Sequence, residues 1–159
     1  MVHSSKVAGC DVISSQMFTL SDYQQKAQET LVPIYGEREA SAIVKIWFET
    51  RLLMSRIDLV MRRKEEVSFP SFEDDLAQLQ GNTPVQLVLG EAFFFDRAFL
   101  VNEHTLIPRP ETEELVAGIL ERFSNKDLKV IDVGTGSGCI AISLQLARPN
   151  WSIMGVDIH

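Results

Sequence analysis

Three glycines at alternate positions interrupt the most strongly patterned part of this sequence. Before them, the branched apolar run from Leu128 to Val133 predicts a β-strand. The segment Gly134-Thr135-Gly136-Ser137-Gly138 then turns the chain, and small residues from Cys139 to about Ala147 predict a helix. Pro149-Asn150 breaks that helix before a second strand, Trp151 to Val156. This order predicts one strand–helix–strand unit of a parallel sheet.

This glycine loop favours a bound nucleoside. Glycines at the end of a parallel strand allow a sharp turn and the close approach of a ligand to the main chain, and the next helix directs free amides toward that turn. Asp157 follows Gly138 by nineteen positions, at the end of the second strand. A carboxylate there can accept hydrogen bonds from both hydroxyls of an adenosine ribose. The alternative is a plain tight turn.

The glycine spacing separates the possible nucleotide ligands. A dinucleotide fingerprint requires its third glycine at position 139, where this chain has Cys139, so a nicotinamide-dependent oxidoreductase is disfavoured. A phosphate-binding loop requires Gly-Lys-Ser/Thr, which does not follow here. The observed Gly-x-Gly-x-Gly resembles the nucleoside loop of class I methyltransferases, in which Asp132 lies near the methionine end of the cofactor. A structural role for Asp132, holding loop amides, is compatible with that position.

Residues 19–90 have apolar side chains at helical spacing, which predicts a small helical bundle. Thr19 or Ser21 is a candidate cap for the first helix, and Gly36 separates it from the second. Further helices are expected over 72–79 and 84–89, the latter ending at Gly90. We interpret the apolar stripes as core: Leu20, Tyr23, Ala27, Leu31 and Ile34; Ile43, Val44, Trp47 and Phe48; and Leu52, Leu53, Ile57 and Val60.

A β-hairpin linker is expected at residues 91–105. Two short aromatic or branched stretches, Phe93–Phe95 and Phe99–Val101, lie on either side of Asp96-Arg97. The prolines that follow keep the chain extended, and Pro110 suits the first turn of a helix. The acidic residues just after it favour the positive end of the helix dipole.

The composition narrows the function classes. The chain has 159 residues and a net charge of -7, which disfavours a broad electrostatic grip on nucleic acid. The one basic cluster, Arg62-Arg63-Lys64, precedes Glu65-Glu66 and is interpreted as a solvated helix face. Two distant cysteines and three scattered histidines (Cys10, Cys139, His3, His104 and His159) predict no metal site and no disulfide framework, which fits a cytoplasmic protein.

The start of the chain carries no apolar run long enough for a signal peptide or a membrane span. We expect residues 1–18 to form a disordered leader, with Met17 as an alternative start. The sequence does not indicate an oligomeric state.

Three segments upstream of the glycine loop extend the methyltransferase resemblance. They are Pro-Val-Gln-Leu-Val-Leu-Gly at 84–90, Phe94 with Phe-Leu-Val-Asn at 99–102, and Leu-Ile-Pro-Arg-Pro-Glu-Thr-Glu-Glu-Leu-Val at 106–116. In this order, followed by the glycine loop, they closely resemble the protein-(glutamine-N5) methyltransferases that modify peptide chain release factors. The resemblance runs from about Thr19 to the last residue and is specific from Pro84 onward.

The resemblance implies an α plus α/β architecture. A helical domain (19–90) would dock the release factor, a hairpin (91–105) would link the parts, and residues 106–159 would begin a class I, Rossmann-like domain truncated after its second strand. That domain would bind S-adenosylmethionine through Asp132, Gly134, Thr135, Gly136, Ser137, Gly138 and Asp157.

The resemblance also implies roles for residues before the loop. Thr112 would lie on the cofactor side, and Arg109 and Glu111 on the substrate side. The start of a helix is sufficient by itself to explain Glu111 and Thr112. Phe94 matches an aromatic residue near the acceptor glutamine, with a hairpin aromatic packed in the core as the alternative. At Asp96-Arg97 the family usually has glycine and an apolar residue, which affects the expected shape of the hairpin.

The family's catalytic signature, Asn-Pro-Pro-Tyr, does not occur in this sequence. In that family the asparagine side chain and a proline carbonyl hold the acceptor amide, whose nitrogen is a poor nucleophile, in line with the methyl group. We therefore assign no catalytic residue and predict that this chain, as given, does not catalyse methyl transfer. The alternative function is a non-catalytic module that binds a release factor or another protein.

A parallel sheet of two strands cannot bury both of its faces, although parallel sheets normally do so. Residues 128–159 are therefore expected to be poorly ordered or to expose apolar surface.

Overall fold

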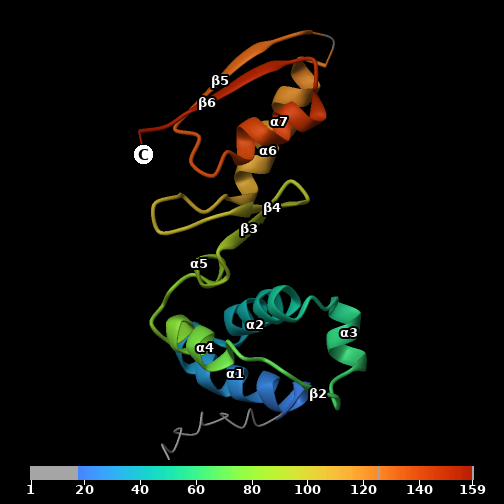
Figure 1. The fold of residues 1–159 in the computed structure, drawn as a ribbon, viewed down its shortest axis with the longest axis vertical. Coiled ribbons are helices and arrows are strands. Elements are labelled where there is room, and N and C mark those ends of the chain that lie inside the picture. Colours follow the sequence, from blue (N-terminus) through green and yellow to red (C-terminus); the bar gives the residue numbers. More distant parts are fainter. Residues whose placement is uncertain (1–17, 125, 159) are drawn as a thin grey trace, which may run out of the picture. The chain divides into compact units, whose positions relative to one another are not determined.

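A computed structural model describes residues 18–124 and 126–158 (Figure 1). The chain divides into two compact units, Met1–Asp74 and Asp75–His159. The division falls inside helix α4 (Phe72–Gln80), ahead of the expected hairpin linker. Apart from Phe18, the expected leader lies outside the described residues, and so does His159.

The first unit is built mainly from α1 (Leu20–Tyr35), α2 (Glu37–Leu52) and α3 (Arg56–Met61). Thr19 caps α1 as predicted: its hydroxyl accepts from the Asp22 amide, while the Asp22 carboxylate accepts from the Thr19 amide at 3.0 Å. Gly36, at φ 78°, ends α1 and separates it from α2, also as predicted. Two short strands absent from the prediction, β1 (Phe18–Thr19) and β2 (Glu66–Val67), pair antiparallel beside the start of α1.

An aromatic cluster forms the core of the first unit. Trp47 is fully buried and stacks on Phe72, with ring centroids 5.1 Å apart and the ring planes inclined by 14°. Phe48, Phe69 and Tyr23 surround this pair with edge-on or tilted rings. Because Trp47 is fully buried, its interpretation as a core residue is confirmed. Aromatic pairs at this spacing add to the stability gained from burial.

The third predicted apolar stripe is wrong. Leu53, Ile57 and Val60 are 92%, 73% and 62% exposed, and the buried residue of α3 is Leu59. The physical reason is a break in helical phase. Leu53 ends α2 in the left-handed conformation, and a new capping box at Ser55 starts α3 with its own orientation. A continuous stripe requires a continuous helix, which this segment is not.

The second unit begins with the end of α4 and with α5 (Val85–Leu89), which stops at Gly90 as predicted. The expected hairpin is also present: β3 (Glu91–Phe94) pairs antiparallel with β4 (Arg97–Leu100). Its two-residue turn places Phe95 and Asp96 at φ 50° and 60°. Two positive φ angles are the signature of the tight turn that matches strand twist, and glycine adopts them most easily. The usual glycine at position 96 is thus explained, and Asp96 takes the same conformation.

After the hairpin come α6 (Pro110–Arg122), β5 (Lys129–Val133), α7 (Cys139–Ala147) and β6 (Ser152–Val156). The strands β5 and β6 pair in parallel, with Lys129 opposite Ser152 and Val133 opposite Val156. In Figure 1, α6 and α7 lie on one side of this pair. A core cluster fills the space among the hairpin, the helices and the strands; its buried members are Phe94, Phe99, Val116, Cys139, Leu144 and Trp151.

The other face of the β5–β6 pair is uncovered. Ile131 faces Met154 and Val133 faces Val156 across the ladder, and all four side chains are exposed. The expectation of exposed apolar surface in this region is confirmed.

Among the described residues the fold is a mixture of helices and three two-stranded sheets, compatible with part of a methyltransferase domain. No helix in the described part is both long and apolar enough to cross a membrane.

Candidate functional site

The glycine loop turns the chain from β5 into α7. Gly134, Gly136 and Gly138 all have positive φ, at 75°, 53° and 76°. The amides of Gly134 and Thr135 both donate to the carbonyl of Val156, at 2.8 and 3.1 Å, which ties the loop to the end of β6. Residues other than glycine rarely adopt these φ angles, so the loop conformation depends on glycine at these positions.

The carboxylate of Asp132 stabilises the loop from the strand side. Thr135 Oγ1 donates to Asp132 Oδ2 at 2.8 Å, and both residues are half-buried. The expected structural role of Asp132 was to accept from loop amides. The bond observed here comes instead from a loop hydroxyl. A carboxylate has several acceptor positions, so this bond leaves Asp132 able to accept others.

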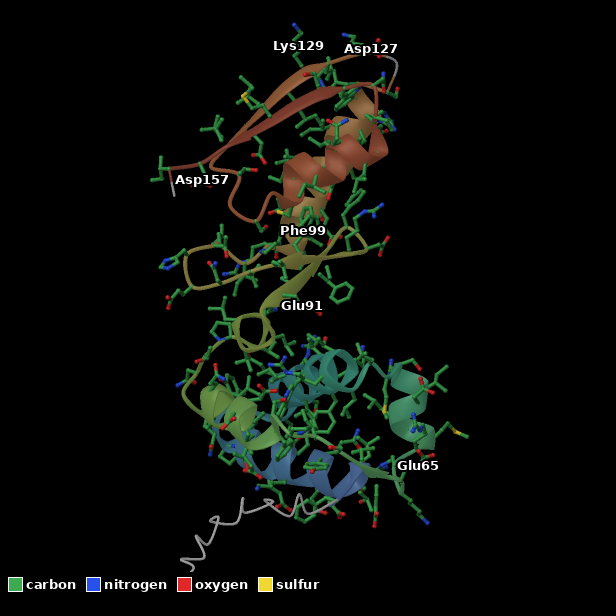
Figure 2. The ribbon with its side chains drawn as sticks, viewed as in Figure 1. Glu65, Glu91, Phe99, Asp127, Lys129 and Asp157 are labelled. Atoms are coloured by element: carbon green, nitrogen blue, oxygen red, sulfur yellow. The ribbon has the colours of Figure 1, made fainter. Side chains whose placement is uncertain are left out.

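Asp157 lies at the end of β6 and contacts the same loop. Its Oδ2 accepts from the Gly136 amide at 2.7 Å, and its Oδ1 accepts from the Ile158 amide at 2.7 Å. Figure 2 shows Asp157 at one end of the β5–β6 pair and Lys129 at the opposite end. The acidic residue and the glycine loop are thus brought together at the carboxyl end of the strands, where ligands bind in open parallel sheets.

The start of α7 completes this arrangement. Gly138 caps α7 with no side-chain hydrogen bond, so the first amides of the helix have no capping acceptor from that residue. Nearby, Ser137 Oγ is buried without a hydrogen-bond partner within the described residues. A buried polar atom of this kind is usually satisfied by a ligand or a water molecule. Backbone donors, an orphan hydroxyl and two carboxylates together suit a ligand with ribose hydroxyls and a cationic amino group.

A cavity of about 450 Å³ opens beside the loop, lined by Asn102, His104, Thr105, Gly136 and Asp157. The wall opposite the loop is the turn between the hairpin and α6. There the Asn102 amide donates to Thr105 Oγ1 at 2.7 Å, and the His104 amide donates to Asn102 Oδ1 at 2.9 Å. The Asn-x-x-Thr spacing at 102–105 is a recognisable turn signal that could have indicated this wall, in which His104 is exposed. Within the described residues, no cluster of His, Cys, Asp or Glu is arranged to hold a metal ion.

Several curated proteins similar to this chain are release factor glutamine methyltransferases. A release factor glutamine methyltransferase from Flavobacterium psychrophilum is 40% identical over 146 residues, covering 87% of this chain and 51% of the relative. The enzyme of that name from Enterococcus faecalis is 47% identical over 114 residues, covering 72% of this chain and 40% of the relative. The one from Bacillus subtilis is 37% identical over 135 residues, covering 77% and 45%. The chain belongs to the release factor glutamine methyltransferase family.

The match corresponds to the N-terminal part of release factor glutamine methyltransferases. The chain spans about half the length, or less, of the curated relatives described above. No protein-family model matches the chain.

Three other residues that the family resemblance singled out are not among those that line the cavity. Arg109 is the exposed residue before α6, and Glu111 is exposed in the first turn of that helix. Thr112 is half-buried, with its amide donating to the Arg109 carbonyl at 3.0 Å. None of these three residues is among the described residues that line the cavity. Their roles toward cofactor and substrate stay predictions.

Phe94 is 1% exposed and belongs to the core cluster, which is the arrangement expected of a hairpin aromatic packed in the core. Its role near an acceptor glutamine stays a prediction. The hairpin turn that follows Phe94 is stabilised by Glu113, whose carboxylate accepts from the Phe95 amide at 3.0 Å. The sequence indicates only a helix-dipole role for Glu113, because nothing in its spacing points to a partner eighteen residues earlier.

Proposed function

We propose that the protein carrying this chain transfers a methyl group from S-adenosylmethionine to the side-chain amide nitrogen of a glutamine in a peptide chain release factor. The names of the relatives support the substrate and the reaction. The observation that carries the proposal is the contact of Asp157 with the amide of Gly136. This contact brings a carboxylate, a group able to accept from ribose hydroxyls, against a glycine loop at the end of a parallel strand pair.

In this proposal, residues 106–159 are the start of a class I, Rossmann-like domain. The loop from Gly134 to Gly138 packs against the cofactor, Asp157 accepts from the ribose hydroxyls, and Asp132 lies toward the methionine end. The turn Asn102–Thr105 covers the side of the site opposite the loop. The cofactor supplies a methyl group on a positively charged sulfur, so neither a metal ion nor a covalent enzyme intermediate is required.

Residues 19–90 are the proposed docking domain for the protein substrate, and residues 91–105 the linker. The acceptor amide needs hydrogen-bond acceptors that orient its nitrogen, and the family supplies them from Asn-Pro-Pro-Tyr. This sequence contains no such segment. We therefore propose that these 159 residues bind the cofactor without catalysing methyl transfer on their own. The second candidate function, a non-catalytic docking module, rests on the same helical unit.

Calorimetric titration of the purified protein with S-adenosylmethionine tests the proposal. Asp157→Asn keeps the size of the side chain and removes its charge, and we expect it to weaken cofactor binding by about tenfold or more, the cost of losing charged hydrogen bonds. Glu114→Gln, an exposed change on α6, is the matched control and should leave binding unchanged. Equal affinities for the Asp157→Asn and unaltered proteins would refute the proposed site. Release factor binding with no measurable cofactor binding would favour the docking module.

A further inference from the structure

Three helices of the first unit enclose a groove of about 510 Å³. Helix α1 contributes mainly glutamines, α2 contributes Lys45, and α3 with the turn after it contributes Arg56 and Arg63. Among the described residues that line it, none carries a carboxylate. The groove is therefore cationic in a chain whose net charge is -7.

The three cations have no ion-pair partner among residues 18–124 and 126–158. The neighbouring Arg62 differs, because its Nε lies 2.7 Å from Glu65 Oε2. From the sequence, Arg62, Arg63 and Lys64 were expected to form one solvated cluster. The fold separates them: Arg62 is paired with an acid, whereas Arg63 joins Lys45 and Arg56 in the groove. Like charges gathered without a counterion favour an anionic partner.

Apolar side chains continue the groove onto the outer face of α3. The floor contains the buried residues Val44 and Leu59, and Val60 lines the groove while remaining largely exposed. Ile57 and Met61, one helical turn apart on α3, are also exposed. Large apolar side chains beside a polar pocket are typical of protein-binding surfaces, where they anchor the partner.

The lining favours a peptide over a nucleic acid. It contains no aromatic side chain on which a base could stack, and the acidic chain as a whole repels a polyanion. The amides of Gln24 and Gln28 are suited to main-chain groups of a peptide, and Gln28 makes only a 3.4 Å contact with Ser41 Oγ. Positive charge, exposed apolar side chains and glutamine side-chain amides thus occur together at this groove.

We propose that this groove binds an acidic segment of a partner protein, in which Asp or Glu residues are interspersed with large apolar ones. The acids pair with Lys45, Arg56 and Arg63, and the apolar residues pack on Val60 and its neighbours on α3. The inference rests on the proposed function in one respect, namely that the partner is the protein substrate.

The test is fluorescence anisotropy of the purified protein with a short labelled peptide of Glu, Leu and Ser. The triple variant Lys45→Gln, Arg56→Gln, Arg63→Gln should weaken binding by about tenfold, because exposed ion pairs contribute modestly but add up. The matched control is Arg38→Gln, Lys64→Gln, Arg97→Gln, which removes three exposed cations outside the groove and should bind as the unaltered protein does. Val60→Ser should also weaken binding, and added salt should weaken it further.

Equal losses in the two triple variants would overturn the proposal, and so would equally tight binding of a peptide with Gln in place of Glu. A single-stranded oligonucleotide that binds more tightly than the acidic peptide, in a groove-dependent way, would replace the peptide with a nucleic acid. A purified peptide chain release factor is expected to displace the peptide, and failure to do so would refute its assignment as the partner. Cofactor titration of the same groove variants separates the two proposals, since the groove can bind the peptide whether or not the cofactor site binds S-adenosylmethionine.

Discussion

Gly155 on β6 lies directly against the side chain of Thr135 in the glycine loop. A Cβ at position 155 would stand 2.8 Å from Thr135 Oγ1 and 3.1 Å from its Cβ, closer than atoms normally approach. The same Thr135 hydroxyl donates to Asp132. The conformation of the loop therefore depends on the absence of a side chain at position 155.

Gly155→Ala is expected to displace Thr135 and break its hydrogen bond to Asp132. Overpacking of this kind costs about 1–3 kcal/mol of stability, and we expect cofactor binding to weaken with it. Urea denaturation and cofactor titration measure the two effects. Gly118→Ala is the control: nothing lies within 4 Å of the added Cβ, and alanine in a helix should stabilise by about 0.5–1 kcal/mol. The same response from both variants would contradict the proposed contact.

Asp96→Gly should stabilise the hairpin. Asp96 has a φ of 60°, which glycine adopts without the steric cost that an L side chain incurs. We expect a gain of about 0.5 kcal/mol, reduced by the greater freedom of glycine in the unfolded chain. Arg97→Gly, one residue later in β4, should have the opposite sign, because glycine inside a strand is destabilising. Thermal unfolding of the two variants decides between these outcomes, and a loss of stability in Asp96→Gly would contradict the turn geometry.

Glu113→Ala should loosen the hairpin turn. The Glu113 carboxylate accepts from the Phe95 amide at 3.0 Å, and its loss leaves that part-buried amide without its acceptor. The expected cost is about 1–2 kcal/mol, in the range of hydrogen bonds to charged groups. Glu114→Ala removes an exposed carboxylate from the same turn of α6 and should cost less than about 0.5 kcal/mol. Hydrogen exchange at the Phe95 amide reports the lost bond directly, and unchanged protection would show that Glu113 is dispensable.

The two capping boxes make the first unit sensitive to acid. The side-chain hydrogen bond from Thr19 lowers the pKa of Asp22 below its ordinary value of 3.8, and that from Ser55 does the same for the pKa of Asp58. A lowered pKa in the folded state means that stability is present above the unfolded value and is lost as the pH falls through the folded one. We expect the urea midpoint to fall as the pH drops below 3.8.

The variant Asp22→Asn, Asp58→Asn is expected to show a weaker dependence on acid pH than the unaltered protein. The pair Glu114→Gln, Glu121→Gln removes two exposed carboxylates outside the capping boxes and is the matched control. Identical pH profiles for the capping variant and the unaltered protein would show that these carboxylates do not link stability to pH.

Local signals explain why so much of the secondary structure was predictable. Thr19, Gly36, Gly90 and Pro110 each act within one turn of the chain, by supplying a hydroxyl, a positive φ or a fixed φ. The spacing of the glycine loop is local as well, so its conformation between β5 and α7 followed from the sequence. The faces of helices are less local: one left-handed residue, Leu53, was enough to turn Ile57 and Val60 from the expected core to the surface.

The sequence by itself determined most of the elements and their order, the glycine loop and the acid that follows it, because caps, turns and periodicity depend on residues a few positions apart. Only the tertiary structure decided which distant groups meet. It brought Asn102 and His104 to the cavity beside Asp157, placed Gly155 against Thr135, and gathered the cations of the groove from separate helices. Such contacts depend on how whole elements pack, through burial and shape rather than spacing along the chain.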